Sequence, residues 1–296
     1  MDALRSTVQP ITRNLPAPIR DTGISLLGAA CYKTLILDLD VTATECIKLG
    51  VSKALGLGII GASAVVKVPQ IVNLVRSQSA AGISFTAYAL ETTAYLVGLA
   101  YNVRQGFPFS TYGETALIAA QNVVIAVLVL HFSGLDPAAA AFVAVLAAAG
   151  WALFSPDLVD LPTLAYLQAG AGALGVASKL PQIWTVWRAG STGQLSAFAV
   201  FNYLVGSLTR IFTTLQEVDD KLILYGFIAG FVLNAVLAVQ MIYYWNSPSP
   251  SPAATSSRGK SSGKKGAPKS YAAAAAPGTP SATPAKAKGP STRRRG

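Results

Sequence analysis

The apolar positions of the chain fall into seven long runs, separated by short stretches that contain charged residues, glycine or proline. A helix needs about twenty apolar residues to cross the hydrocarbon layer of a bilayer, which is roughly 30 Å thick. We therefore predict seven membrane-spanning helices, at residues 54–75, 83–103, 112–132, 137–154, 164–187, 195–215 and 222–245. The pattern indicates an all-α membrane protein.

The apolar segment 24–37 differs from these runs because it is short, is interrupted by Lys33 and is followed by Asp38 and Asp40. We expect an interfacial amphipathic helix there rather than a span. The first twenty residues contain three arginines and three prolines without a following apolar core. We therefore expect no cleavable signal peptide.

The sequence repeats itself at an offset of 112 residues. At this offset the segment 67–71 (KVPQI) matches 179–183 (KLPQI), and further identical pairs follow without a gap. These pairs are Arg76 and Arg188, Ser79 and Ser191, Ser84 and Ser196, and Asn122 and Asn234. The repeat predicts two parallel three-helix units joined by a linking helix, a 3+1+3 arrangement.

This arrangement divides the chain into five parts. They are an N-terminal segment (1–50), a first repeat (51–132), a linking helix (133–160), a second repeat (161–245) and a basic tail (246–296).

Composition agrees with a lipid environment, because 52% of the residues are hydrophobic and only 12% are charged. The net charge of +10 lies in the tail, where ten Lys or Arg residues follow Ser247 without a single acid. We expect this tail to be disordered and attracted to anionic headgroups. Nucleic-acid binding is not expected, because no aromatic residues alternate with the charges. The positive-inside rule places the tail in the cytosol.

Two Pro-Gln pairs, Pro69-Gln70 and Pro181-Gln182, lie at equivalent positions inside predicted spans. Proline removes a helical hydrogen bond, so each pair predicts a kink whose opened backbone the glutamine could bond. The kinks could be hinges between two moving bundles, or static bends that shape packing. Lys67 and Lys179 precede them, and each could face a cavity and an anionic group such as phosphate, or extend to the interface.

Other polar residues within the spans are candidates for lining a cavity. Glu91 and Arg210 could form a neutralising pair with each other, or either could line a ligand path. Asn122, Asn202 and Asn234 are expected to face the bundle interior, where hydrogen bonds between helices would also explain them.

Catalytic and metal-binding patterns are not found in the sequence. His131 is the single histidine, and Cys31 and Cys46 form no CxxC motif. We predict no metal site, no cofactor and no enzymatic activity. Glu114 is expected at the membrane interface, and the paired glycines at 56–58 and 170–172 are expected to allow close helix packing.

Two helix-borne Pro-Gln pairs in a 3+1+3 arrangement resemble the PQ-loop membrane proteins, which include the SWEET sugar transporters and the lysosomal cystine transporter. Several stretches are more specifically similar to the mannose-P-dolichol utilization defect protein family. These stretches are 52–58 (SKALGLG), 106–114 (GFPFSTYGE), 193–197 (GQLSA), 207–213 (SLTRIFT) and 243–246 (YYWN).

The resemblance implies an endoplasmic-reticulum membrane protein required for the use of dolichyl-phosphate-mannose and dolichyl-phosphate-glucose in N-glycan and GPI-anchor synthesis. Such a protein would move or present the lipid-linked sugar, with Lys67 and Lys179 neutralising its phosphate. One alternative is a PQ-loop transporter of small solutes such as sugars or amino acids. Another is a non-transporting scaffold for the glycosyltransferases of the endoplasmic reticulum.

Overall fold

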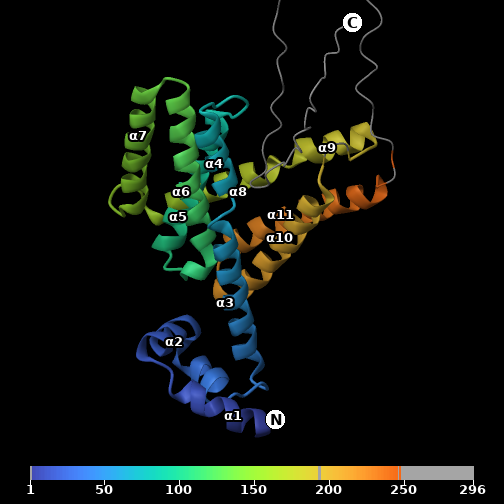
Figure 1. The fold of residues 1–296 in the computed structure, drawn as a ribbon. Helices are drawn as coiled ribbons and strands as arrows, with labels where there is room; N and C mark the ends of the chain where they lie inside the picture. Colours follow the sequence, from blue (N-terminus) through green and yellow to red (C-terminus); the bar gives the residue numbers. More distant parts are fainter. Residues whose placement is uncertain (1, 193–194, 246, 248–296) are drawn as a thin grey trace, which may run out of the picture.

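The computed structural model describes residues 2–192, 195–245 and 247, and this part of the chain is built from helices joined by short turns (Figure 1). The first repeat contains α3 (Thr44–Ser63), α4 (Val68–Ser77), α5 (Phe85–Arg104) and α6 (Phe109–Phe132). Helix α7 (Asp136–Phe154) follows as the linking helix. The second repeat contains α8 (Leu161–Ala177), α9 (Leu180–Ala189), α10 (Ala197–Glu217) and α11 (Lys221–Tyr243).

The helix boundaries reproduce the sequence repeat. Helices α4, α5 and α6 each begin 112 residues before α9, α10 and α11. Ser84 and Ser196 cap α5 and α10 in the same way, because each hydroxyl accepts a hydrogen bond from the backbone N–H three residues later. Helices α4 and α9 both end on a residue in the left-handed conformation, Gln78 and Gly190. The two units therefore share one local structure.

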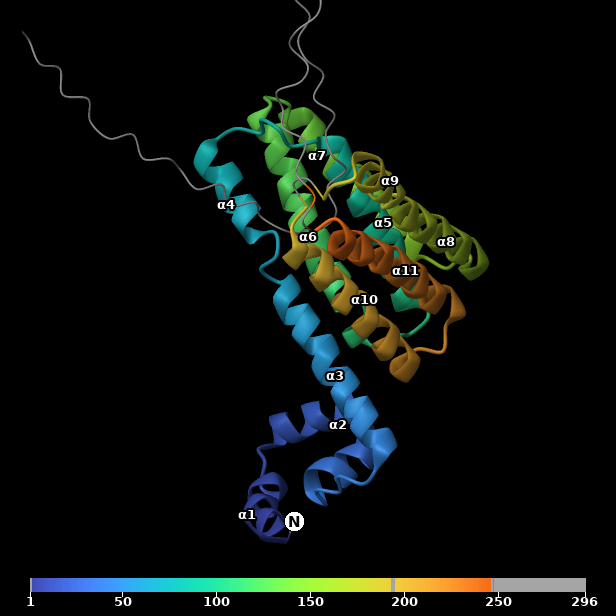
Figure 2. The same cartoon turned by 90° about the vertical axis from the view of Figure 1, so that its right-hand side faces the viewer.

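The helices of both repeats pack in the same order. In the first repeat α3, α4 and α5 all contact α6, and in the second repeat α8, α9 and α10 all contact α11. Helices α6 and α11 are thus the central helices of their units. Between the repeats, α3 packs on α10 and α8 packs on α5 (Figure 2). The first helix of each unit therefore contacts the penultimate helix of the other unit.

Five helical segments of the described chain are long and apolar enough to cross a membrane: Thr44–Ser77, Phe109–Phe132, Asp136–Phe154, Ala197–Glu217 and Lys221–Tyr243. The predicted second and fifth spans are helical but fall outside this set. Helix α5 includes Glu91 and two neighbouring threonines, and α8 has only 17 residues before its break. Large apolar side chains such as Trp151 and Phe198 are exposed on the outer faces of the helices. Such exposure fits a surface that faces lipid.

The N-terminal segment folds back on the beginning of α3. It contains α1 (Asp2–Arg13), α2 (Ala17–Tyr32) and a short π-helical turn η1 (Lys33–Leu37). Residues 24–37 are helical, as α2 with an interruption at Gly28 and then η1, and the interfacial placement of this segment stays a prediction. A disulfide joins Cys31 to Cys46 and ties this segment to the first turn of α3. The predicted disorder of the tail concerns residues that lie outside the described part.

Candidate functional site

Each repeat contains a helix break at its Pro-Gln pair. Pro69 and Pro181 occupy the first turn of the new helices α4 and α9, where a proline leaves no helical hydrogen bond unmade. Residues 64–67 form a turn rather than a kinked continuation of α3. Both prolines are exposed, whereas Lys67 is buried and Lys179 is half-buried.

The backbone opened at the first break is satisfied by Gln121 of α6, not by the glutamine of the motif. The Gln121 Oε1 accepts a hydrogen bond of 2.9 Å from the Lys67 N–H, and its Nε2 donates one of 2.8 Å to the Ser63 carbonyl. Gln70 instead accepts a 2.6 Å hydrogen bond from the Tyr88 hydroxyl. Gln121 was not predicted as a site residue. Its position beside Asn122, two polar residues in an otherwise apolar run, was the available signal.

Lys67 lies inside the first repeat and faces a carboxylate. Its Nζ is 3.1 Å from the Glu91 Oε2 and 4.9 Å from the centre of the Tyr88 ring, and the residue is 5% exposed. The Tyr95 hydroxyl donates a further hydrogen bond to Glu91. Glu91 therefore pairs with Lys67, and the predicted pair between Glu91 and Arg210 is wrong. The helix break places the lysine opposite α5 in the same repeat.

The equivalent position in the second repeat is different. Lys179 lies over the ring of Tyr203, with 5.1 Å from its Nζ to the ring centre. Tyr203 occupies the position that Glu91 has in the first repeat, 112 residues earlier. Within the part of the chain that the structure describes, no carboxylate lies within ion-pair distance of Lys179. The duplicated lysines are thus neutralised in one unit only.

Arg210 forms an ion pair across the repeats with Glu114 of α6. Its Nη1 also donates to the Ser110 carbonyl. The Arg210 side chain is 6% exposed and that of Glu114 is 20% exposed. Glu114 is therefore part of the contact between the repeats, and its place at the membrane interface stays a prediction.

The three candidate asparagines have unlike surroundings. Asn234 is buried and donates to the Tyr203 carbonyl at 3.1 Å and to the Ser207 hydroxyl at 3.2 Å. Asn122 is completely buried, and neither of its side-chain atoms has a hydrogen-bond partner in the described protein. Asn202 is exposed, which corrects its predicted inward orientation.

A second polar cluster lies where α3, α6 and α10 meet. The Glu217 carboxylate accepts hydrogen bonds from Ser52 (2.5 Å), from Lys53 (2.8 Å) and from the Ser110 hydroxyl. Lys53 also donates to the Ser110 hydroxyl at 3.0 Å. None of these four residues was predicted as a site residue, because all of them lie just outside the predicted spans 54–75, 112–132 and 195–215.

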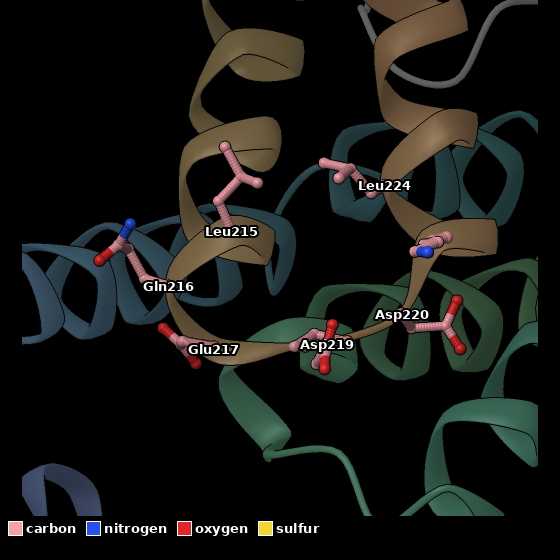
Figure 3. Close-up of a pocket in the computed structure, with 8 residues that line it drawn as sticks. Leu215, Gln216, Glu217, Asp219, Asp220 and Leu224 are labelled. Carbon is pink, nitrogen blue, oxygen red and sulfur yellow. The ribbon is translucent and has the colours of Figure 1, made fainter.

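A hollow of about 400 Å³ lies beside this cluster, at the turn between α10 and α11. It is lined by residues 215–221 and Leu224, and Figure 3 shows Glu217, Asp219 and Asp220 along the turn. The residues predicted to line a cavity are not among them. Among the polar candidates, Lys67 and Glu91 contact each other, whereas Arg210 pairs with Glu114 and Asn202 is exposed.

The fold and these paired sites define a multi-pass, all-helical membrane protein built from two equivalent units. A family model described as the PQ loop repeat matches residues 51–111 and 164–223, once in each unit. The chain is 30% identical over 186 residues to the human protein "Solute carrier family 66 member 3", covering 62% of this chain and 90% of that relative. The chain belongs to the PQ-loop repeat family of membrane proteins. No solved structure matches it.

Proposed function

We propose that this protein is a non-enzymatic membrane protein of the endoplasmic reticulum that moves or presents dolichyl-phosphate-mannose and dolichyl-phosphate-glucose. The support comes from the stretches at 52–58, 106–114 and 207–213, which resemble the mannose-P-dolichol utilization defect family. The two equivalent units further support a body with two halves that can move relative to each other.

The observation that carries the proposal is the unequal neutralisation of Lys67 and Lys179. The charge of Lys67 is compensated by Glu91 at 3.1 Å, so an anionic ligand would have to displace that carboxylate. Lys179 has the aromatic face of Tyr203 in its place. An ammonium group at membrane depth is costly without a counter-charge. A phosphodiester beside Lys179 would supply that charge, and we assign to Lys179 the phosphate contact that the sequence had distributed over both lysines.

The disulfide supports an orientation for the molecule. Disulfides form and persist in oxidising compartments such as the lumen of the endoplasmic reticulum. The Cys31–Cys46 bridge thus favours a luminal N-terminal segment, and seven crossings would return the basic tail to the cytosol. This agrees with the excess of Lys and Arg after Ser247.

The proposal is tested in a strain that lacks the protein, by profiling its lipid-linked oligosaccharides. Such a strain is expected to accumulate species that stop before the luminal mannoses. The wild-type chain and Lys179→Arg should restore the full-length species, whereas Lys179→Gln should not. Equal restoration by Lys179→Gln at equal protein level would contradict the phosphate contact. Truncated glycans would also accompany a scaffold for glycosyltransferases, but those enzymes would then co-purify with the protein and lipid movement in vesicles would be normal.

A second candidate is transport of a small sugar or amino acid, which is favoured by the similarity to a protein named as a solute carrier. Uptake of labelled solutes by vesicles that contain the purified protein separates the two candidates. Uptake together with a normal oligosaccharide profile in the deletion strain would favour the solute transporter.

A further inference from the structure

The two repeats are joined on one face of the molecule. We call it the N-terminal face, where α5 and α10 end at Arg104 and Glu217. The opposite face, called the C-terminal face, is where α4, α9 and α11 end at Ser77, Ala189 and Tyr243. The contacts on the two faces differ in kind.

The N-terminal face contains ionic contacts that cross from one repeat to the other. The side chain of Glu217 in the second repeat is 2% exposed. Its carboxylate accepts hydrogen bonds from Ser52, Lys53 and Ser110 of the first repeat. About two turns deeper along α10, Arg210 pairs with Glu114. Tyr101 of α5 donates a 2.6 Å hydrogen bond to Asp220, the capping residue of α11.

The apolar core on this face also crosses the repeats. Its buried members come from α5, from the end of α7 and from the beginnings of α8 and α11: Val97, Ala100, Tyr101, Leu153, Leu164 and Ile223. Arg104 extends the junction, since its Nη1 donates to the carbonyls of Leu153 and Val159. This face is therefore closed by both polar and apolar contacts.

Towards the C-terminal face the cores separate. One cluster contains Leu74, Tyr88, Ile125, Ala126 and Val129, all from the first repeat, and is completed by the linking helix. The other contains Val200, Leu237, Ala238 and Met241, all from the second repeat. In Figure 1, α6 and α7 rise on one side while α10 and α11 slant away from them. Each unit thus has its own core at this end.

We propose that Ser52, Lys53, Ser110 and Glu217, together with the Glu114–Arg210 pair, form an ionic gate that holds the repeats together on the N-terminal face. The gate has to open for any passage to that face, and the structure is the state in which it is closed. This inference rests on the proposed function in one respect, that a ligand passes between the repeats. Removing one partner of a buried ion pair leaves an uncompensated charge, so single substitutions in this cluster weaken the contact between the repeats.

The experiment measures distances between spin labels on the full-length protein in nanodiscs. Both cysteines of the sequence form the Cys31–Cys46 bridge, so labels attach only at introduced cysteines. Ser77→Cys and Ala189→Cys place labels at equivalent exposed ends of α4 and α9, on the C-terminal face. The gate is weakened by Lys53→Gln or Glu217→Gln. The control is Lys48→Gln, because Lys48 pairs with Glu45 within α3 and on the surface.

Weakening the gate should raise the population with a shorter label distance at least about fivefold, since the C-terminal face closes as the other opens. Lys48→Gln should leave the distribution unchanged, and the swapped variant Lys53→Glu/Glu217→Lys should restore it. An unchanged distribution in both weakened variants would overturn the proposal, as would a swapped variant that folds but behaves like the single ones. The readout needs no lipid-linked sugar, so the gate can hold even if Lys179→Gln supports normal glycosylation.

Discussion

Lys67 and Lys179 occupy the same position in the two repeats, and their ammonium groups meet different chemistry. Lys67 is paired with the Glu91 carboxylate at 3.1 Å, and Lys179 lies 5.1 Å above the Tyr203 ring. At the position equivalent to Glu91 of α5, α10 has Tyr203. Duplicated units with unlike counter-charges can divide a structural role and a binding role between them.

This relationship predicts different costs for removing each charge. Lys67→Met should lower the free energy of unfolding by about 3–5 kcal/mol, because it leaves the Glu91 carboxylate unpaired. Lys179→Met removes only the contact with Tyr203 and should cost about 0.5–1 kcal/mol. Unfolding in detergent followed by circular dichroism measures both. Equal losses would show that Lys179 has a counter-charge as well.

The bridge made by Gln121 predicts a specific loss in Gln121→Leu. The variant leaves the Lys67 N–H and the Ser63 carbonyl without partners, and each buried orphan costs about 1–3 kcal/mol. Leu233 stands at the equivalent place in the second repeat, so leucine itself suits the helix. Asn73→Leu, on the exposed side of α4, serves as the control and should change the melting temperature little. If both variants melt alike, the bridge contributes nothing to stability.

Helix α3 approaches α6 at Gly56, which predicts that a side chain there is harmful. A Cβ on Gly56 would lie 2.9 Å from the Ser110 carbonyl oxygen, whereas one on Gly58 would meet nothing within 4 Å. Gly56→Val should cost about 1–3 kcal/mol through overpacking, and Gly58→Val should be tolerated. The fraction of monodisperse protein after heating reports the difference. A tolerated Gly56→Val would mean that α3 can move away from α6 freely.

The buried asparagines predict opposite responses to the same substitution. Asn234→Leu loses two hydrogen bonds to α10 and should destabilise by about 1 kcal/mol, at roughly 0.6 kcal/mol each. Asn122→Leu replaces a buried amide that has no hydrogen-bond partner among the described residues and should be neutral or stabilising. Unfolding of the two variants under identical conditions tests this. A marked loss in Asn122→Leu would point to a partner that Asn122 acquires in another state of the protein.

The repeat could be predicted from the sequence because it depends on local chemistry, whereas the Pro-Gln pairs were predicted as kinks within spans and are helix starts in the structure. The match at 67–71 and 179–183, with the capping serines Ser84 and Ser196, specifies where helices begin. Packing of the paired glycines was predicted in part only. Gly56 is in close contact with α6, but Gly58, Gly170 and Gly172 face open space.

The pairing of charges could not be predicted in the same way. Helices that are apolar on all sides do not reveal which face packs against which neighbour. The depth of Glu91 and Arg210 in the sequence pattern therefore predicted neither the direction in which each side chain points nor its ion-pair partner. Lys67, at the break between α3 and α4, pairs with Glu91 of α5, and Arg210 pairs with Glu114 because α10 packs on the other repeat. Both contacts depend on the tertiary arrangement alone.

The bridge between Cys31 and Cys46 determines how the protein can be produced. The bacterial cytoplasm keeps thiols reduced, so a chain made with its amino terminus on that side would not form the bridge. Its N-terminal segment would then not be tied to α3, and both cysteine thiols would react with alkylating reagents. A eukaryotic secretory host, with its own oxidoreductases, is the appropriate source of material for biophysical work.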